Sequence, residues 1–356
     1  MKIGIIGLPQ TGKKSFFELL TGAKAPSAPQ DQMKALSGIA EVRDERFDRL
    51  AALYRPKKET RARIAVDLVP RIDPGSVRPE VLAIAAETDA LCHVVRAFED
   101  DAVYHVSGSV NPARDIALVN DELVLHDQLF IEKRLERIAK NQKKGRDERS
   151  AREEALLASF REHLDAGRPL RTRAVSDEEA ALIASYPFLT MKKMIVAVNA
   201  GDADIATGGV SAAVEEALTE SGIACMRISA KLEAEIALLA DEAERREFMA
   251  ASGIAAPALN VLTGLCMDAL GLISFFTVGT DEVRQWEVRR GAAAPEAAGA
   301  IHSDIQRGFI RAEVMKYPDL IEAGSEDAVK KAGRFHVMGR EYIVEDGDII
   351  SFRFNV

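Results

Sequence analysis

The sequence predicts an α/β fold built around a parallel sheet. Short apolar runs without polar alternation recur along the chain, as is typical of strands buried on both faces. Stretches of helical periodicity separate these runs, and strands joined through helices pair in parallel by right-handed crossovers. A glycine-rich turn follows the first apolar run and opens a helical stretch, which is the arrangement of a phosphate-binding loop.

Five apolar runs are predicted to be the strands of this sheet. Glycines end the helical stretches between them: Gly22 closes the first helix and Gly222 a later one, both in C-cap position. The predicted strands are residues 2–7, 63–69, 89–98, 193–200 and 223–230.

The alternation of strands and helices stops between residues 120 and 167. Two apolar helical stripes flank a polar tip that contains Gly145, which predicts an antiparallel helical hairpin inserted in the sheet domain. Residues 133–152 hold nine basic and three acidic side chains, although the whole chain has a net charge of -9. This reversal of charge is either a solvated helical surface or a contact with RNA. The candidate contact residues are Lys140, Lys143, Lys144 and Arg146.

Beyond about residue 271 the chain becomes rich in strands and predicts a small α+β domain. The length of 356 residues also favours two or more domains. We therefore expect a sheet domain over residues 1–119 and 168–273, a helical hairpin over 120–167, and a C-terminal domain over 274–356.

The composition argues against several classes of protein. Cys92, Cys225 and Cys266 lie far apart in apolar settings, which disfavours a disulfide framework or a zinc site and favours a reducing cytoplasm. No apolar run is long enough to span a bilayer, so no membrane partner is expected. The acidic balance argues against general coating of nucleic acid, and we expect no sequence recognition of DNA.

The glycine-rich turn matches the pattern G-x-x-x-x-G-K at Gly7, Gly12 and Lys13. Converging backbone N–H groups and a helix N-terminus suit phosphates, and Lys13 would reach the outer ones. The next position normally carries a Ser or Thr that binds Mg²⁺, but here it is Lys14, and Ser15 follows one place later. The turn is thus predicted to bind phosphate, the alternative being a strand-to-helix turn without a ligand. The predicted nucleotide contacts in it are Gly7, Gln10, Thr11, Gly12, Lys13, Lys14 and Ser15.

Several segments carry a resemblance to a known family, including "GLPQTGKKSFFELLTGA", "HVSGSVNPARD", "AIHSDIQRGFIRAE" and the ending "DGDIISFRFNV". The chain resembles the YchF / Obg-like ATPase family over almost its whole length. The resemblance implies a Ras-like P-loop G domain, an inserted α-helical coiled-coil hairpin and a C-terminal α+β TGS domain, which is ubiquitin-like. It also implies ATP preferred over GTP, and association with ribosomes or RNA through the hairpin and the TGS domain.

Three positions depart from that family where it serves Mg²⁺ or the γ-phosphate. Lys14 replaces the metal-binding Ser, Gln32 falls near a metal-binding Thr of switch I, and Pro70 replaces a switch II Gly whose N–H senses the γ-phosphate. Asp67 survives as the one candidate metal ligand. The resemblance therefore implies bound ATP, GTP or the diphosphate, with a doubtful need for Mg²⁺ and slow or absent hydrolysis.

The base-recognition segment "VNAGD" also departs from the family. Asn199 and Asp202 are of the G-protein type, whereas the family has Glu at the last place and favours adenine. Ser229 and Ala230 fit the final base-contacting loop, so the choice between ATP and GTP stays open. Alternatively, Asn199 and Asp202 only shape a turn at the strand end.

His105 matches a family histidine that helps to orient the attacking water, and it is the candidate catalytic residue by resemblance. A lone histidine is more often structural. Three functions remain: a nucleotide-binding protein with weak or lost hydrolysis, an active regulatory ATPase or GTPase switch, and an RNA- or protein-binding scaffold that no longer binds nucleotide.

Overall fold

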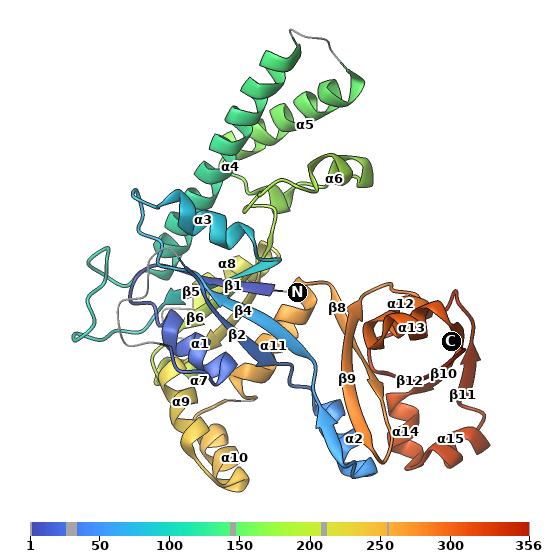
Figure 1. The fold of residues 1–356 in the computed structure, drawn as a ribbon. Coiled ribbons are helices and arrows are strands. Elements are labelled where there is room, and N and C mark those ends of the chain that lie inside the picture. Colours follow the sequence, from blue (N-terminus) through green and yellow to red (C-terminus); the bar gives the residue numbers. More distant parts are fainter. Residues whose placement is uncertain (1, 26–33, 143–146, 208–211, 255, 356) are drawn as a thin grey trace. The chain divides into compact units, whose positions relative to one another are not determined.

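The computed structural model describes residues 2–25, 34–142, 147–207, 212–254 and 256–355. The chain forms two compact units, one of residues 1–38 and 65–258 and one of residues 39–64 and 259–356. Figure 1 follows the chain through the elements of both units.

The first unit is built on the predicted sheet, whose strand order is β2-β4-β1-β5-β6-β7. The pairs β1–β4, β1–β5, β5–β6 and β6–β7 are all parallel. All five predicted strands are confirmed, because continuous apolar runs such as β5 are buried along their whole length. β2 was not predicted; of its six residues only Ala40 is buried, and they form no continuous apolar run. The strands are β1 Lys2–Ile6, β2 Leu36–Glu41, β4 Arg63–Leu68, β5 Ala90–Arg96, β6 Lys193–Asn199 and β7 Ala224–Ile228.

Helices cover this sheet and join its strands, as the crossovers require. The sheet core includes Ile6, Val95 and Val196, each fully buried. The helices of the first unit outside the hairpin are α1 Lys13–Thr21, α3 Pro79–Ala86, α6 Asp177–Ile183, α7 Asp204–Thr207, α8 Ala212–Glu220, α9 Ala230–Leu238, α10 Glu242–Ala251 and the short η1 Leu170–Thr172.

The predicted helical hairpin consists of α4 Pro112–Gln142 and α5 Glu148–Asp165, which pack on each other. Its own core contains most of the predicted stripes, Ile131, Ile138, Leu156, Phe160 and Leu164, with Leu135 partly buried. The predicted tip at Gly145 lies outside the described residues. α4 begins before residue 120 and its first turns pack in the sheet core, so one continuous helix serves both the sheet and the hairpin.

The buried carboxylate of Asp127 fastens the hairpin to the chain that returns to the sheet. Its oxygens accept hydrogen bonds from the backbone N–H groups of Leu189 and Thr190 at 2.9 and 2.8 Å, and from the Thr190 hydroxyl at 2.6 Å. Three donors satisfy this charge, which burial without partners would make costly.

The second unit is a six-stranded sheet of order β11-β10-β12-β8-β9-β3 with helices. The expected strand-rich C-terminal domain is therefore present. Its strands are β3 Lys58–Thr60, β8 Leu272–Thr277, β9 Glu282–Arg289, β10 Phe309–Lys316, β11 Phe335–Met338 and β12 Asp348–Phe354. Its helices are α2 Glu45–Tyr54, α11 Ala258–Ala269, α12 Ala294–Ile301, α13 Ser303–Arg307, α14 Tyr317–Ala323 and α15 Glu326–Lys331.

The C-terminal domain was expected to begin at residue 274, but the second compact unit contains more of the chain. From Leu259 on, α11 counts to the second unit. So do residues 39–64, which were expected in the sheet domain and which include the second half of β2 and the first two residues of β4. The physical reason is packing: Phe47 and Leu50 of α2 are fully buried in one cluster with Phe276. β3 adds a further link, because it pairs in parallel with β9.

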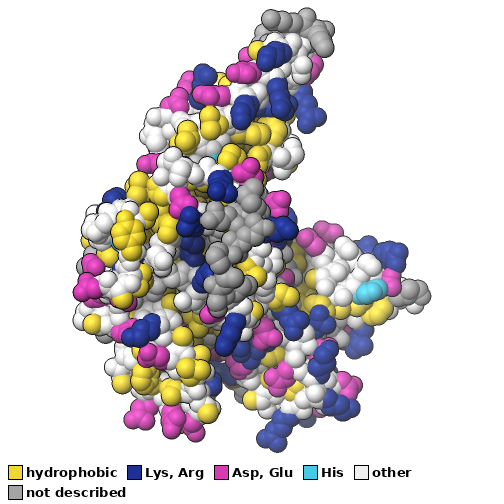
Figure 2. All heavy atoms as spheres, turned by 60° about the vertical axis from the view of Figure 1, so that its left-hand side comes forward, with side chains coloured by type: hydrophobic (Ala, Val, Ile, Leu, Met, Phe, Trp, Pro, Cys, Tyr) yellow, Lys and Arg dark blue, Asp and Glu magenta, His cyan; other side chains and the backbone are white. Residues whose placement is uncertain are grey.

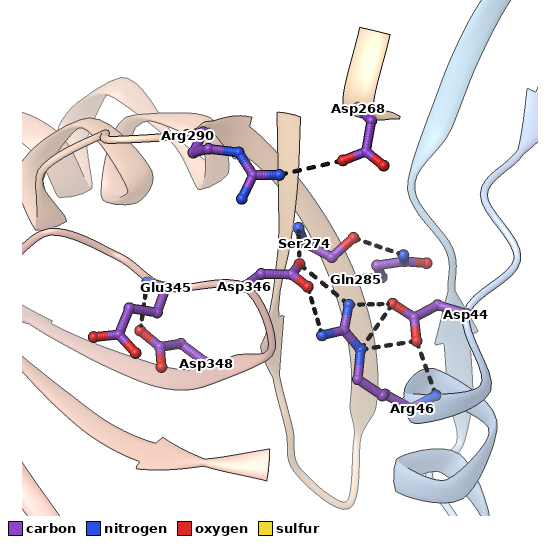
Figure 3. Close-up of polar contacts among 9 residues, drawn as sticks. All are labelled: Asp44, Arg46, Asp268, Ser274, Gln285, Arg290, Glu345, Asp346 and Asp348. Carbon is purple, nitrogen blue, oxygen red and sulfur yellow. Dashed lines mark hydrogen bonds and ion pairs between the residues drawn. The ribbon is translucent and has the colours of Figure 1, made fainter. Parts of the chain in front are cut away.

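A polar network fixes α2 within the second unit (Figure 3). The Arg46 guanidinium donates to Asp44 Oδ2 at 2.7 Å and to Asp346 Oδ2 at 2.8 Å. Asp346 Oδ1 also accepts from the backbone N–H of Ser274 at 2.9 Å. Burial alone would raise the pKa of Asp346, but these donors hold it below its usual value.

Candidate functional site

The turn between β1 and α1 requires glycine at two positions. Gly7 has φ 147° and Gly12 has φ 91°, which are conformations that other residues rarely adopt. A side chain would also find no room, because a Cβ on Gly7 would lie 2.5 Å from the Val94 carbonyl oxygen and one on Gly12 would lie 2.3 Å from Asn199 Nδ2. The backbone therefore wraps tightly here, as a phosphate-binding loop must.

Lys13 is folded into this loop. Its side chain is buried, and its ammonium donates to the carbonyl oxygens of Gly7 and Leu8 at 2.6 and 2.5 Å. Burial, together with the nearby positive charge of Arg71, lowers the pKa of Lys13 to about 7, although the negative charge of Asp73 acts to raise it. An anion entering the loop would replace the two carbonyls and restore the charged form of Lys13.

A cavity of about 450 Å³ opens beside the loop. One wall is the loop itself and the other is the chain just after β4. The first turn of α1 holds no acidic residue, and Gly12 at its N-cap provides no side-chain hydrogen bond, so the positive end of the helix dipole is not compensated there. The lining residues are Pro9, Gln10, Thr11, Gly12, Lys13, Lys14, Ser15, Leu68, Val69, Pro70 and Arg71.

Arg71 belongs to this cavity although the sequence analysis did not select it. Its side chain is 55% exposed and its Nε donates to Asp73 Oδ2 at 3.0 Å. The available signal was a cation directly after Pro70, in the segment where the family has its γ-phosphate sensor. Lys13, Lys14 and Arg71 thus give the cavity three basic side chains, and no carboxylate is among the described residues that line it.

Asp67, the candidate metal ligand, is not among the residues that line this cavity. It is buried, accepts a hydrogen bond from Ser37 Oγ at 2.6 Å and pairs with Lys2 Nζ at 2.9 Å. In the part of the chain that the structure describes, no group of three or more His, Cys, Asp or Glu side chains is placed to hold a metal ion. Gln32 lies outside the described residues. Among the described residues of the cavity, a lysine, Lys14, stands at the position where the phosphate-loop pattern places a hydroxyl ligand of Mg²⁺.

The predicted base-recognition residues meet at the ends of β6 and β7. Asn199 is buried; its Nδ2 donates to the Thr11 carbonyl at 3.0 Å, and its Oδ1 accepts from the Ala230 N–H at 3.1 Å. Asp202 Oδ1 accepts from Ser229 Oγ at 2.5 Å. The four residues thus converge, with Asn199 tied to the phosphate loop, but none of them lines the cavity described above.

His105 lies away from the cavity at the phosphate loop, in the segment just before α4. Its ring is buried, with Nε2 2.9 Å from Asp115 Oδ2 and Nδ1 accepting from the Ser107 N–H at 3.1 Å. It does not line the cavity, and these contacts serve to fix the loop to the start of α4. A catalytic role for His105 stays a prediction.

The proposed RNA contacts are only partly described. Lys140 lies exposed on α4, with its Nζ 4.0 Å from Glu136 Oε2, whereas Lys143, Lys144 and Arg146 fall outside the described residues. Among the described helices, none is both long and apolar enough to cross a membrane. Cys92, Cys225 and Cys266 form no disulfide with one another.

Comparison with known proteins gives matches along the whole chain. Residues 272–355 match the family model YchF-GTPase_C, described as "Protein of unknown function (DUF933)". The chain is 38% identical to the ribosome-binding ATPase YchF of Bacillus subtilis, with 99% of each chain covered. It is 36% identical to Obg-like ATPase 1 of Oryza sativa subsp. japonica, over 100% of this chain and 92% of that one.

A solved structure, that of the Schizosaccharomyces pombe YchF GTPase, matches with a TM-score of 0.87 and 30% identity. The match covers 99% of this chain and 97% of the other. The likeness extends through both compact units, so the P-loop GTPase fold with its C-terminal domain is shared as a whole.

Proposed function

Because the chain belongs to the YchF / Obg-like ATPase family, we propose that it binds ATP, GTP or the corresponding diphosphate and associates with ribosomes. We further propose that it binds the nucleotide without Mg²⁺ and hydrolyses it slowly or not at all. One observation carries this proposal: among the described residues, the cavity at the phosphate loop is lined by Lys13, Lys14 and Arg71 and by no carboxylate.

The cations of the cavity explain why the protein would bind a nucleotide without hydrolysing it efficiently. Three cations neutralise the phosphates in the ground state as point charges. Hydrolysis needs more, because charge that develops on the transferred phosphoryl group is normally stabilised by a metal in fixed octahedral geometry. Each missing transition-state contact costs on the order of 3 kcal/mol, or roughly a hundredfold in rate. Lys14 and Pro70 remove two such contacts together.

Calorimetric titration of the full chain tests the proposal. ATP, GTP, ADP and GDP are titrated once in Mg²⁺ and once in EDTA. For the nucleotide that binds most tightly, we expect the Kd values in the two conditions to agree within about threefold, a difference in binding free energy of less than 1 kcal/mol. A loss of affinity of more than about tenfold in EDTA would contradict metal-free binding. No binding of any of the four would favour the scaffold that has lost nucleotide binding.

The same titrations decide the base. The relatives that are ATPases favour adenine, whereas Asp202 is the carboxylate type that recognises guanine in G proteins. Asp202 is held by Ser229 at its Oδ1, while Lys231 Nζ lies 3.6 Å from its Oδ2. A guanine ligand would have to compete with these contacts, and so ATP is our first expectation.

The partner claim rests on relatives that are named for ribosome binding. The basic stretch of the hairpin and a TGS role for the C-terminal unit are the proposed contacts, and such a partner would place the protein in the cytoplasm. Co-sedimentation with ribosomes, using a variant neutralised at Lys143, Lys144 and Arg146, tests the hairpin. Unchanged pelleting of that variant would remove this stretch from the proposal.

A further inference from the structure

A second cavity, of about 300 Å³, lies at the side of the hairpin and away from the phosphate loop. Figure 2 shows Lys and Arg side chains gathered beside hydrophobic ones along the hairpin, below its grey tip. Two aromatic rings and three cations dominate the cavity wall, and no carboxylate is among the described residues that line it. The lining residues are Phe130, Lys133, Arg134, Arg137, Ser185 and Tyr186.

The aromatic part of this wall is rigidly held. The rings of Phe130 and Tyr186 meet edge to face with centroids 5.1 Å apart, and Tyr186 contacts Phe188 in the same way at 5.9 Å. The Tyr186 hydroxyl donates to Glu153 Oε1. A ring fixed at its edges and at its hydroxyl keeps its orientation, so little entropy is lost when a flat ligand stacks on it.

The cations of the wall differ in how they are engaged. Arg134 is neutralised by Glu153, whose Oε2 accepts from Arg134 Nη2 at 2.9 Å, and its guanidinium lies over the Tyr186 ring at 5.6 Å. Lys133 and Arg137 stand one helical turn apart on α4 and are exposed. Across the described residues, no ion pair involves either of them, so their charge is available to an anion at the rim.

We propose that this cavity binds one unstacked nucleotide of an RNA strand, with the base stacked on the Tyr186 ring beside Phe130 and its phosphate on Lys133 and Arg137. RNA is recognised in this way in single-stranded segments, where bases stack on aromatic side chains and cations follow the backbone. An acidic peptide would use the two cations but would leave the aromatic wall without a partner. The proposal rests on the proposed ribosome association and adds a defined site to it.

Fluorescence polarisation of the full chain with a short fluorescein-labelled oligoadenylate RNA tests the site. We expect the double variant Lys133→Ala with Arg137→Ala to bind about tenfold more weakly, and Tyr186→Leu to lose a similar factor. Tyr186→Phe keeps the ring and is expected to bind like the wild type. The matched control is Arg161→Ala with Arg168→Ala, which removes two exposed cations from the same unit but outside the cavity.

Equal weakening by the cavity pair and the control pair would overturn the proposal, because only general charge would then be at work. Poly-glutamate that displaces the RNA as well as unlabelled oligoadenylate does would also overturn it, in favour of an acidic protein. Circular dichroism melts verify that Tyr186→Leu is folded; if it is not, the surface pair Lys133 and Arg137 decides alone. Pelleting of the cavity variants with ribosomes is measured separately. If these variants still pellet with ribosomes and also bind RNA like the wild type, the cavity site is rejected and the ribosome association is not.

Discussion

The ammonium of Lys2 lies 2.9 Å from a carboxylate oxygen of Asp67, inside the sheet of the first unit. Asp67 also accepts from Ser37 Oγ, and its side chain is only 6% exposed. The acid that the family pattern would offer to a metal is thus already neutralised by a neighbouring strand. The hydrogen bond and the negative charge of Asp67 raise the pKa of Lys2, because both favour the charged ammonium.

Asp67→Asn is therefore expected to affect stability and not nucleotide affinity. The change leaves Lys2 without its partner and should lower the free energy of unfolding by about 1–2 kcal/mol, because one side of the pair is buried. Urea denaturation measures this, and calorimetry should find the nucleotide Kd unchanged. A variant of unaltered stability that loses Mg²⁺-dependent binding would contradict the structural role.

Nucleotide affinity is expected to depend on pH through Lys13. Burial lowers its pKa to about 7 in the free protein, and a bound phosphate should raise it again. Lys13 is then charged in both states below about pH 7, whereas above it binding must take up a proton. The affinity should therefore fall as the pH rises from about 7 to 9.

Proton uptake is measured by calorimetry at about pH 8 in buffers that differ in ionisation enthalpy. Lys13→Arg should abolish the uptake, because a guanidinium stays protonated throughout this range. Lys14→Met is the matched control, since Lys14 is exposed and its loss should weaken binding while proton uptake persists. Equal uptake in the Lys13 variant would place the titrating group elsewhere.

Arg71 is expected to distinguish triphosphate from diphosphate. Arg71→Ala removes one of the three cations of the cavity and should weaken ATP binding by about tenfold, with a smaller effect on ADP, since a charge-assisted contact contributes about 1.5–3 kcal/mol. Asp73→Asn is the control with the opposite expected effect on ATP affinity, because it releases Arg71 from its ion pair. Competition binding with a fluorescent nucleotide reports both; equal losses for ATP and ADP would reject a contact with the terminal phosphate.

Restoring the family residues Lys14→Ser and Pro70→Gly is not expected to restore hydrolysis. Asp67 remains paired with Lys2, so the metal would still lack a carboxylate. Phosphate release should stay within about threefold of the wild type, far from the roughly hundredfold that each regained contact could contribute. A hundredfold rise in the double variant would show that the remaining site is intact and would favour the active regulatory switch.

Local features were sufficient to predict the first sheet and its loop. A buried parallel strand such as β5 is apolar along its whole length, and a turn with positive φ at Gly7 and Gly12 requires glycine, so the sequence carries both signals directly. The two apolar stripes of the hairpin were likewise predicted from the spacing of apolar residues in the sequence. Lys14 was recognisable as a departure because the spacing of the phosphate-loop pattern defines its position, whereas Pro70 was recognised through the family resemblance.

What the sequence could not reveal is which core each amphipathic segment joins. The apolar face of α2 would suit many cores, and only packing with Phe276 and the Arg46–Asp346 pair assigns it to the second unit. Likewise, Asp67 keeps its motif position, yet a lysine on the neighbouring strand decides that it is neutralised. The strands and the phosphate loop follow from short-range sterics and from the hydrophobic pattern, which the sequence contains. Charge pairing and core membership depend on contacts between residues far apart in the chain, and only the tertiary structure brings these residues together.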